Sequence, residues 1–224
     1  MNGFRFTNRS EAGSRLAFLL EGYARRHDTV VLAVPRGGVP VAAELAARLH
    51  LPLDVFVVRK LGLPRHEELA MGAVAADGRV TLDEALIAAA RISQAQIAAV
   101  VARETLEVQR RIRLYRDGRA ERSLRGQVVI LVDDGLATGS TMSAAIHAVR
   151  AHDPRAVIVA VPVGSREACD AIESLADTLI CMLRPETFEA VGSYYRDFSQ
   201  IGDDEVRRAL AEAASMNAER SLVV

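Results

Sequence analysis

The stretch VVILVDDGLATGST, residues 128–141, decides both the fold and the chemistry of this chain. Its run of branched apolar residues is typical of a buried strand, and two adjacent aspartates follow directly. Neighbouring carboxylates repel each other, so a pair at the end of a buried strand needs a partner that relieves the repulsion. The hydroxyls of a vicinal diol or a hydrated magnesium ion would do so, which makes Asp133 and Asp134 candidate ligands.

The loop after the aspartates consists largely of small and hydroxyl-bearing residues: Gly135, Ala137, Thr138, Gly139, Ser140 and Thr141. Between a strand and a helix, such a loop can surround a phosphate group with backbone N–H donors. A GxxxxGK[ST] loop is excluded, because the spacing differs and the lysine is missing. An Asx-turn that leads into a capped helix remains the alternative.

A second loop of this kind, PRGG at residues 35–38, follows an earlier predicted strand. Gly37 and Gly38 let an anion approach the main chain, and Arg36 adds a fixed positive charge with forked donors. A plain turn with a solvent-facing arginine is the alternative. One molecule that carries two phosphate groups and a sugar would engage both loops and the acid pair.

Strands and helices alternate along the chain. Strands are predicted at 29–34, 53–58, 128–132, 156–163 and 178–183, and helices at 10–26, 39–50, 93–115, 140–152 and 166–176. The alternation predicts an α/β fold, with a mainly parallel twisted sheet flanked by helices, in one domain over residues 1–224. Two appendages are expected: a hairpin, turning at Asp77-Gly78, with a long helix within 59–120, and a small C-terminal hood at 184–224. In such folds ligands collect beyond the carboxyl ends of the strands, where both loops lie.

Composition narrows the classes of partner. The chain has 224 residues, 50% of them hydrophobic, which is enough for one sizeable core, and its net charge of -1 offers no field for nucleic acid or a membrane surface. No stretch has the length of a signal peptide or a membrane span, which favours a cytoplasmic protein. Cys169 and Cys181 lack metal-type spacing and are expected to be buried free thiols. The five histidines are scattered and suggest no metal cluster.

The segment 128–141 resembles the fingerprint of the type I phosphoribosyltransferases: a hydrophobic strand, two acidic residues and a TGxT-type loop. PRGG resembles the pyrophosphate loop of that family, and VRKLGLPRHEELAMGAV and VGSYYRDF resemble a bacterial group whose acceptor is unassigned. The resemblance implies transfer of phosphoribosyl from 5-phosphoribosyl-1-pyrophosphate (PRPP) to a small nitrogenous acceptor, such as a nucleobase. Magnesium would be the cofactor and pyrophosphate the product.

The resemblance also implies roles for individual residues. Asp133 and Asp134 would hold the ribose hydroxyls and magnesium. Arg36 and Gly37, with Gly38 beside them, would hold the pyrophosphate, in a loop that often contains a non-proline cis peptide in relatives. The loop for the 5′-phosphate would comprise Gly135, Leu136, Ala137, Thr138, Gly139, Ser140 and Thr141.

In the family, a mobile segment between these two loops closes over the site and excludes water. Residues 59–83 occupy that interval here. We expect Arg59, Lys60 and Arg65 to reach the pyrophosphate, the first two as catalytic residues. His66, Glu67 and Glu68 would lie in the same lid, where a glutamate could contact magnesium or the acceptor. A solvated charged loop is the alternative.

Aromatic residues gather after the last predicted strand, and their faces can stack on a flat heterocycle. Phe188, Tyr194 and Tyr195 are the acceptor-binding candidates, although with Phe198 they could equally form a satellite core. The 6-oxopurine enzymes have a lysine near the end of the strand after the fingerprint. Residues 156–167 contain none, which argues against hypoxanthine or guanine as the acceptor.

The long helix carries an apolar stripe at helical spacing: Ile97, Val101, Val108, Ile112 and Tyr115. The stripe would cover part of this chain or a second subunit in a homodimer. Its arginines are interleaved with glutamates, which favours a solvated face over a nucleic-acid patch. Two other functions stay open: a PRPP-sensing regulator that binds nucleic acid or protein, and a hydrolase or phosphorylase acting on a nucleotide or sugar phosphate.

Overall fold

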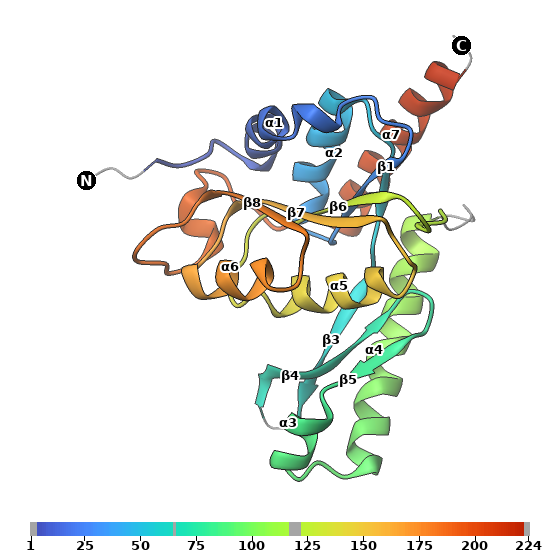
Figure 1. Ribbon diagram of the computed structural model, residues 1–224, viewed down its shortest axis with the longest axis vertical. Helices are drawn as coiled ribbons and strands as arrows, with labels where there is room; N and C mark the ends of the chain where they lie inside the picture. The colour runs from blue at the N-terminus through green and yellow to red at the C-terminus, as the bar shows by residue number, and fades with distance from the viewer. Residues whose placement is uncertain (1–3, 65, 117–121, 222–224) are drawn as a thin grey trace.

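A computed structural model describes residues 4–64, 66–116 and 122–221, and it contains two sheets (Figure 1). The main sheet has five parallel strands in the order β2 (Leu53–Val55), β1 (Thr29–Ala33), β6 (Val128–Val132), β7 (Ala156–Val163) and β8 (Thr178–Leu183). The predicted α/β fold is therefore confirmed. All residues of β1 and β6 are buried, because helices cover both faces of the sheet.

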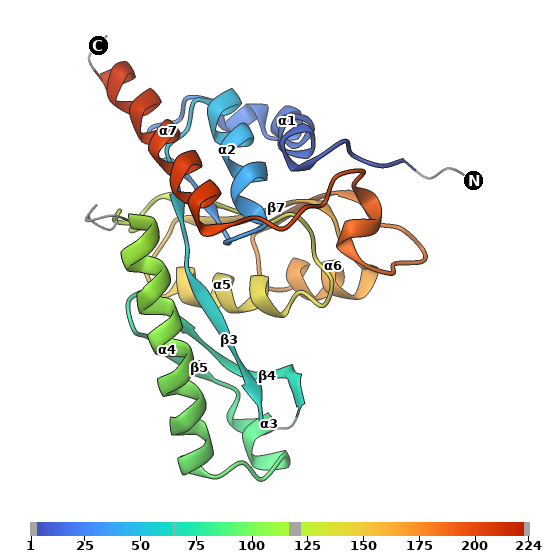
Figure 2. The same ribbon diagram turned by 180° about the vertical axis from the view of Figure 1, so that it is seen from behind.

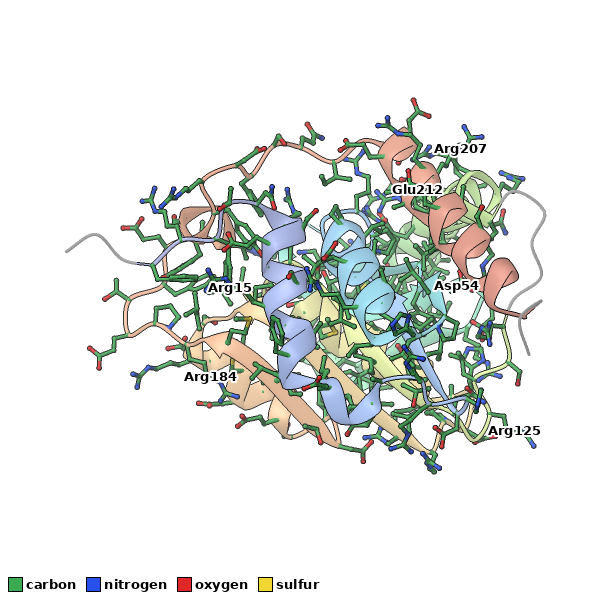
Figure 3. The ribbon with its side chains drawn as sticks, turned by 90° about the horizontal axis from the view of Figure 1, so that it is seen from above. Arg15, Asp54, Arg125, Arg184, Arg207 and Glu212 are labelled. Atoms are coloured by element: carbon green, nitrogen blue, oxygen red, sulfur yellow. The ribbon has the colours of Figure 1, made fainter. Side chains whose placement is uncertain are left out.

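The helices form a layer on each face. One layer contains α1 (Arg9–Leu19), α2 (Gly38–Leu49) and α7 (Asp203–Ser221), and the other contains α5 (Ser140–Arg150) and α6 (Arg166–Glu173) (Figures 1 and 2). Figure 3 shows the first layer from above, with α1 and α2 side by side over the strands. A Cβ atom on Gly13 would lie 3.0 Å from the Val41 carbonyl carbon, so only a glycine lets α1 approach α2 this closely.

The second sheet is antiparallel and stands beside the main one. It contains β3 (Val58–Leu63), β4 (His66–Ala75) and β5 (Val80–Leu82), and it is followed by α3 (Glu84–Ala89) and α4 (Gln94–Arg116). The predicted hairpin turn joins β4 to β5, with Gly78 at a φ of 80°. β3 and β4 pack against α5, and α4 packs against β3, β4 and α7. The apolar stripe of α4 thus covers parts of its own chain, while a homodimer stays a prediction.

Several predicted boundaries were wrong: the helix predicted at 166–176 ends at Glu173, and larger differences concern the first helix and one strand. The first helix ends at Leu19 rather than Arg26, before the short 3-10 turn η1 (Glu21–Tyr23), and Asn8 rather than Ser10 caps it by accepting from the Glu11 N–H. The predicted strand 53–58 is divided between the two sheets. Its first part leaves the main sheet after Val55, where the Phe56 N–H donates to the Ala33 carbonyl, and Val58 begins β3.

The predicted C-terminal hood at 184–224 has two parts. Its first part, residues 184–202, contains the 3-10 turn η2 (Val191–Tyr194), and we call it the hood. The rest, over the described residues, is the helix α7, which packs on α2, α4 and β2 as part of the main body. Within the predicted hood, it is residues 184–202 that lie over the strand ends, where Tyr195 contacts Asp134.

The two cysteines lie together beside Gly164, since a Cβ there would be 2.7 Å from the Cys169 sulfur and 3.4 Å from the Cys181 sulfur. Both are free, and burial raises the pKa of the Cys181 thiol to about 12 and also raises that of Cys169. A raised pKa keeps a thiol protonated and unreactive at neutral pH. We expect neither thiol to react with an aromatic disulfide reagent in the native protein, and both to react after denaturation. Rapid native reaction of either one would contradict this.

Over the described residues, no helix is long and apolar enough to cross a membrane.

Candidate active site

The acid pair lies where β6 ends. Asp133 and Asp134 follow Val132 directly, and the Asp134 N–H donates to Asp133 Oδ1 at 2.8 Å. Burial, and then the neighbouring Asp134 carboxylate, raise the pKa of Asp133 well above its ordinary value. Burial also raises the pKa of Asp134, although Arg9 opposes that shift. Two carboxyl groups held this close favour hydroxyl donors or a cation as their partners.

The PRGG loop packs directly on this pair. The Val34 N–H donates to the Val132 carbonyl at 2.9 Å, which brings the ends of β1 and β6 together. A Cβ atom on Gly37 would lie 2.6 Å from Asp134 Cγ, and one on Gly38 would lie 2.6 Å from the Val132 carbonyl oxygen. Both glycines are needed because any side chain there would collide with the β6 loop. The Pro35-Arg36 peptide bond is cis, as the family resemblance implies.

The small-residue loop turns from β6 into α5. Gly139, at a φ of 75°, is the N-cap of α5 and has no side chain to satisfy the first N–H groups of the helix. Thr138 Oγ1 and Ser140 Oγ lie 3.0 Å apart, and Ala137 and Thr138 are exposed. Exposed hydroxyls and amides at a helix N-terminus are well suited to an anion.

Leu136 attaches that loop to the end of β7. Its side chain is buried, its N–H donates to the Val163 carbonyl, and its carbonyl accepts from the Ser165 N–H. The Ser165 hydroxyl donates to the Ala137 carbonyl at 2.8 Å. Leu136 therefore holds the loop to the end of β7, and its amide is not available to a phosphate.

The amino-acid sequence also matches the model of a known protein family. Residues 8–199 match the phosphoribosyl transferase domain. The chain belongs to the phosphoribosyltransferase family. A phosphoribosyl transferase of Mycobacterium tuberculosis, so named provisionally, is 41% identical over 220 residues, which cover 95% of this chain and 49% of that protein. The chain thus spans about half the length of the curated relatives it matches. The crystal structure of TT1426 from Thermus thermophilus is similar to it, with a TM-score of 0.84 and 40% identity over 93% of this chain and 99% of that one.

Arg9 is a member of this phosphoribosyltransferase site that the sequence did not reveal. It begins α1, and its Nε donates to Asp134 Oδ2 at 2.8 Å, with 9% of its side chain exposed. Its guanidinium carbon lies 3.8 Å from the centre of the Phe198 ring, and Nη1 donates to the Ser199 carbonyl at 2.9 Å. No sequence motif marks Arg9, because its partners lie in distant parts of the chain.

Tyr195 is a buried residue of the hood and does not face a ligand. Its ring is 3% exposed and packs between the rings of Phe6 and Phe198, at centroid distances of 5.5 and 5.1 Å. Its hydroxyl donates to the Asp134 carbonyl at 2.7 Å. The assignment of Tyr195 to acceptor stacking is therefore corrected: a ring enclosed in this way supports the acid pair.

Phe188 and Tyr194 keep more access to solvent. Their rings stack at 5.8 Å with an interplanar angle of 19°, and both are half-buried. Phe188 lines a cavity of about 630 Å³, whose wall also includes Ala137 and Thr138 of the β6–α5 loop. Arg166 and Glu186, whose charged groups are 3.5 Å apart, lie on the same wall. The structure thus places one aromatic candidate next to the predicted phosphate loop.

Arg36 points toward the beginning of α7. Its Nη1 lies 3.8 Å from Asp203 Oδ1, which also accepts from the Tyr115 hydroxyl at 2.5 Å. Arg110 donates to Asp203 Oδ2 at 3.2 Å. These hydrogen bonds, with that of Tyr115 first, lower the pKa of Asp203, so it stays ionised at neutral pH as a partner for Arg36.

Of the predicted lid residues that the structure describes, Arg59 and His66 have surroundings other than the acid pair. Arg59 donates to Glu104 Oε2 on α4 at 2.8 Å, so its charge already has a buried partner, and Lys60 lies half-buried on β3. His66 lines a cavity with Arg91 and Gln96, near the junction of α3 and α4, at the end of the small sheet away from the main one (Figures 1 and 2). Arg65 lies outside the described residues, as do the side chains of Glu67 and Glu68.

Proposed function

We propose that this phosphoribosyltransferase binds PRPP with magnesium and transfers its phosphoribosyl group to a nitrogen atom of a small heterocycle, releasing pyrophosphate. The contact between the PRGG loop and the acid pair carries the proposal. Two anion-type loops and two carboxylates converge within one packed unit, and PRPP has the matching pyrophosphate, 5′-phosphate and diol.

Each part of PRPP has a proposed partner. The ribose 2′- and 3′-hydroxyls donate to Asp133 and Asp134. An ionised carboxylate accepts hydrogen bonds from hydroxyl groups but repels a phosphate, which carries the same charge. The 5′-phosphate lies on the exposed amides and hydroxyls at the N-terminus of α5, from Ala137 to Thr141. The pyrophosphate lies on Gly37 and Gly38, with Arg36 turning toward it from Asp203.

The chemistry is a substitution at C1 of the ribose. The bond from C1 to the pyrophosphate oxygen breaks, positive charge develops on the ring, and the acceptor nitrogen donates its electron pair to C1. Arg36 stabilises the negative charge on the leaving pyrophosphate, and the acid pair holds the ribose so that the acceptor meets the opposite face. Removing one donor of such a kind commonly costs about a hundredfold in rate.

Asp133 and Asp134 would hold magnesium together with the substrate, because carboxylate oxygens are among the ligands that magnesium prefers. Over the described residues, no group of three or more His, Cys, Asp or Glu side chains forms a ready-made metal site, and magnesium typically takes one or two carboxylates plus substrate phosphates. When bound, it would neutralise charge on the departing pyrophosphate.

The acceptor is assigned to the cavity of about 630 Å³ beside the phosphate loop. Phe188 offers a ring face there, and the pair Arg166 and Glu186 offers both hydrogen-bond donors and acceptors. We retain the lid as a proposal, with residues 59–83 closing over the pyrophosphate after PRPP binds, because the oxocarbenium-like centre must be protected from water.

The arginines of α4 give little support to a nucleic-acid-binding regulator. Arg110 and Arg111 both donate to Glu107, and Arg103 donates to Glu104. The two glutamates compensate part of the positive charge of these arginines, which reduces the uncompensated charge on which binding of nucleic acid depends.

Titration calorimetry with PRPP and magnesium, followed by a panel of purines, pyrimidines and small heterocycles with a pyrophosphate assay, tests the proposed function. We expect magnesium-dependent PRPP binding and pyrophosphate release with one class of acceptor. PRPP binding without release for any heterocycle would overturn the transfer step. An absence of PRPP binding would overturn the assignment of both loops.

Phe188→Ala should separate the acceptor half of the site from the PRPP half. Loss of one stacking face is expected to raise the acceptor KM about tenfold and to leave the PRPP affinity within about twofold of the parent value. Steady-state kinetics with the identified acceptor would measure the first, and calorimetry the second. Phe18→Ala, which removes an exposed ring from α1, is the matched control. Equal loss of both affinities in Phe188→Ala would contradict the placement of the acceptor.

A further inference from the structure

The N-terminal segment (residues 6–9) and the hood together cover the acid pair, and we call this cover the roof. The Phe6 N–H donates to the Tyr194 carbonyl at 2.8 Å, the Arg196 N–H donates to the Phe6 carbonyl at 2.8 Å, and the Asp197 N–H donates to the Thr7 carbonyl at 3.0 Å. Two residues after this ladder, Arg9 enters α1 and points back to Asp134. The N-terminal segment is therefore a structural part of the site.

Arg9 and the main chain divide the oxygens of the acid pair. Asp133 Oδ1 accepts from the Asp134 N–H, and Asp134 Oδ2 accepts from Arg9 Nε, both at 2.8 Å. The two carboxyl groups also interact with each other, so a diol would replace that contact and take the other oxygen of each, Asp133 Oδ2 and Asp134 Oδ1. One oxygen per residue matches a diol, which offers one hydroxyl to each.

The guanidinium is itself held rigidly. It lies 3.8 Å from the centre of the Phe198 ring and donates to the Ser199 carbonyl, and its side chain is 9% exposed. The flat group is thus held at three points, by a carboxylate, a ring face and a carbonyl. A lysine could not reproduce this arrangement, because its ammonium group has no planar face and no forked donors.

Closure of the roof does not need this charge. The three backbone hydrogen bonds and the packing of Phe6 on Tyr195 already join the N-terminal segment to the hood. A buried ion pair carries a desolvation cost, and well-packed apolar residues of similar volume are often at least as stable. A buried arginine at this point therefore calls for a role beyond holding the hood in place.

We propose that Arg9 is a positioning residue for the ribose: it fixes the Asp134 carboxylate in the orientation that receives the diol of PRPP. This inference rests on the proposed function, since it concerns the same site. It assigns the N-terminal segment and the hood to the ribose half of the site, in addition to any role at the acceptor half.

The test compares three ligands on the full chain by calorimetry, each with the same magnesium concentration: PRPP, ribose 5-phosphate and pyrophosphate. Arg9→Met removes the donors, Arg9→Gln keeps an amide NH2 donor without the charge, and Arg9→Lys keeps the charge without the fork. Arg15→Met, an exposed arginine of the same helix that is paired with Glu11, is the matched control (Figure 3).

We expect Arg9→Met to weaken PRPP and ribose 5-phosphate about tenfold or more, because small displacements of a positioned group can cost as much as about a hundredfold. Pyrophosphate, which has no diol, should bind within about twofold of the parent value. Arg9→Gln should recover part of the loss, and Arg9→Lys should recover less. Added ethylguanidinium should partly restore PRPP binding to Arg9→Ala by filling the same space.

Other outcomes would overturn the inference in distinguishable ways. Equal loss for all three ligands, in Arg9→Gln as well as Arg9→Met, would show that Arg9 only supports the fold. Unchanged PRPP affinity in each variant, while the parent binds PRPP, would show that Asp134 needs no such partner. Failure of the parent chain to bind PRPP would instead overturn the proposed function, and the role of Arg9 with it.

Discussion

Asp134→Asn is expected to reduce the affinity for PRPP by about a hundredfold or more. The substitution removes a charged acceptor for a ribose hydroxyl and leaves the buried guanidinium of Arg9 opposite a neutral amide. Truncating one partner of a buried charge pair typically costs about 2–5 kcal/mol, and the part that falls on the free protein will also lower its stability. Calorimetry with PRPP gives the affinity, and urea denaturation gives the free energy of unfolding, which we expect to fall by about 3 kcal/mol.

The matched control is Asp204→Asn, which removes a carboxylate that is 91% exposed at the beginning of α7. It should change neither the PRPP affinity nor the stability beyond about 0.5 kcal/mol. If Asp134→Asn binds PRPP as tightly as the parent chain, the acid pair is not the ribose site.

Gly37→Ala is expected to be as damaging as the loss of the carboxylate, although it adds only a methyl group. That methyl carbon would lie 2.6 Å from Asp134 Cγ, so either the PRGG loop or the acid pair must move. The two loops then no longer present their groups to one molecule at the proper separation. We expect PRPP affinity to fall about a hundredfold, because misplacement by about 1 Å can have an effect of that size.

Gly22→Ala makes the same chemical change where no atom lies within 4 Å of the added carbon and where φ is not positive. PRPP affinity should stay at the parent value there. A Gly37→Ala protein with normal PRPP affinity would show that the contact between the loops is not needed for binding. Thermal unfolding of both variants would separate loss of fold from loss of site.

Much of the fold was predictable because it depends on local patterns. The buried runs of β6 and β7, the intervening helix and the glycine turn at Gly78 each depend on residues close together in the sequence. The contact between the PRGG loop and the acid pair was also predictable, since carboxyl ends of parallel strands meet at one edge of a sheet. The division of residues 53–58 between two sheets was not, because it depends on where Phe56 can bury its ring.

The site was predictable only in part for a related reason. Loop residues such as Gly37 and Thr138 belong to short motifs, whereas Arg9 is placed by partners far along the chain. Tyr195 carries the same aromatic signal whether it faces a ligand or lies beneath one, and only the packing of Phe6 and Phe198 decides between these. The lid residues depend on the position of a whole sheet, which no local pattern specifies.

The contact between Phe6 and Tyr195 in the roof also bears on the order in which parts of the protein fold during synthesis. Arg9 is made 125 residues before Asp134, and the strand-like pairing of residues 6–7 with 194–197 waits longer still. Contacts between such distant segments form late, after the local elements of a chain have folded. A nascent chain can therefore complete its two sheets and still lack a finished ribose site, so ligand binding would report that the hood has docked on the N-terminal segment.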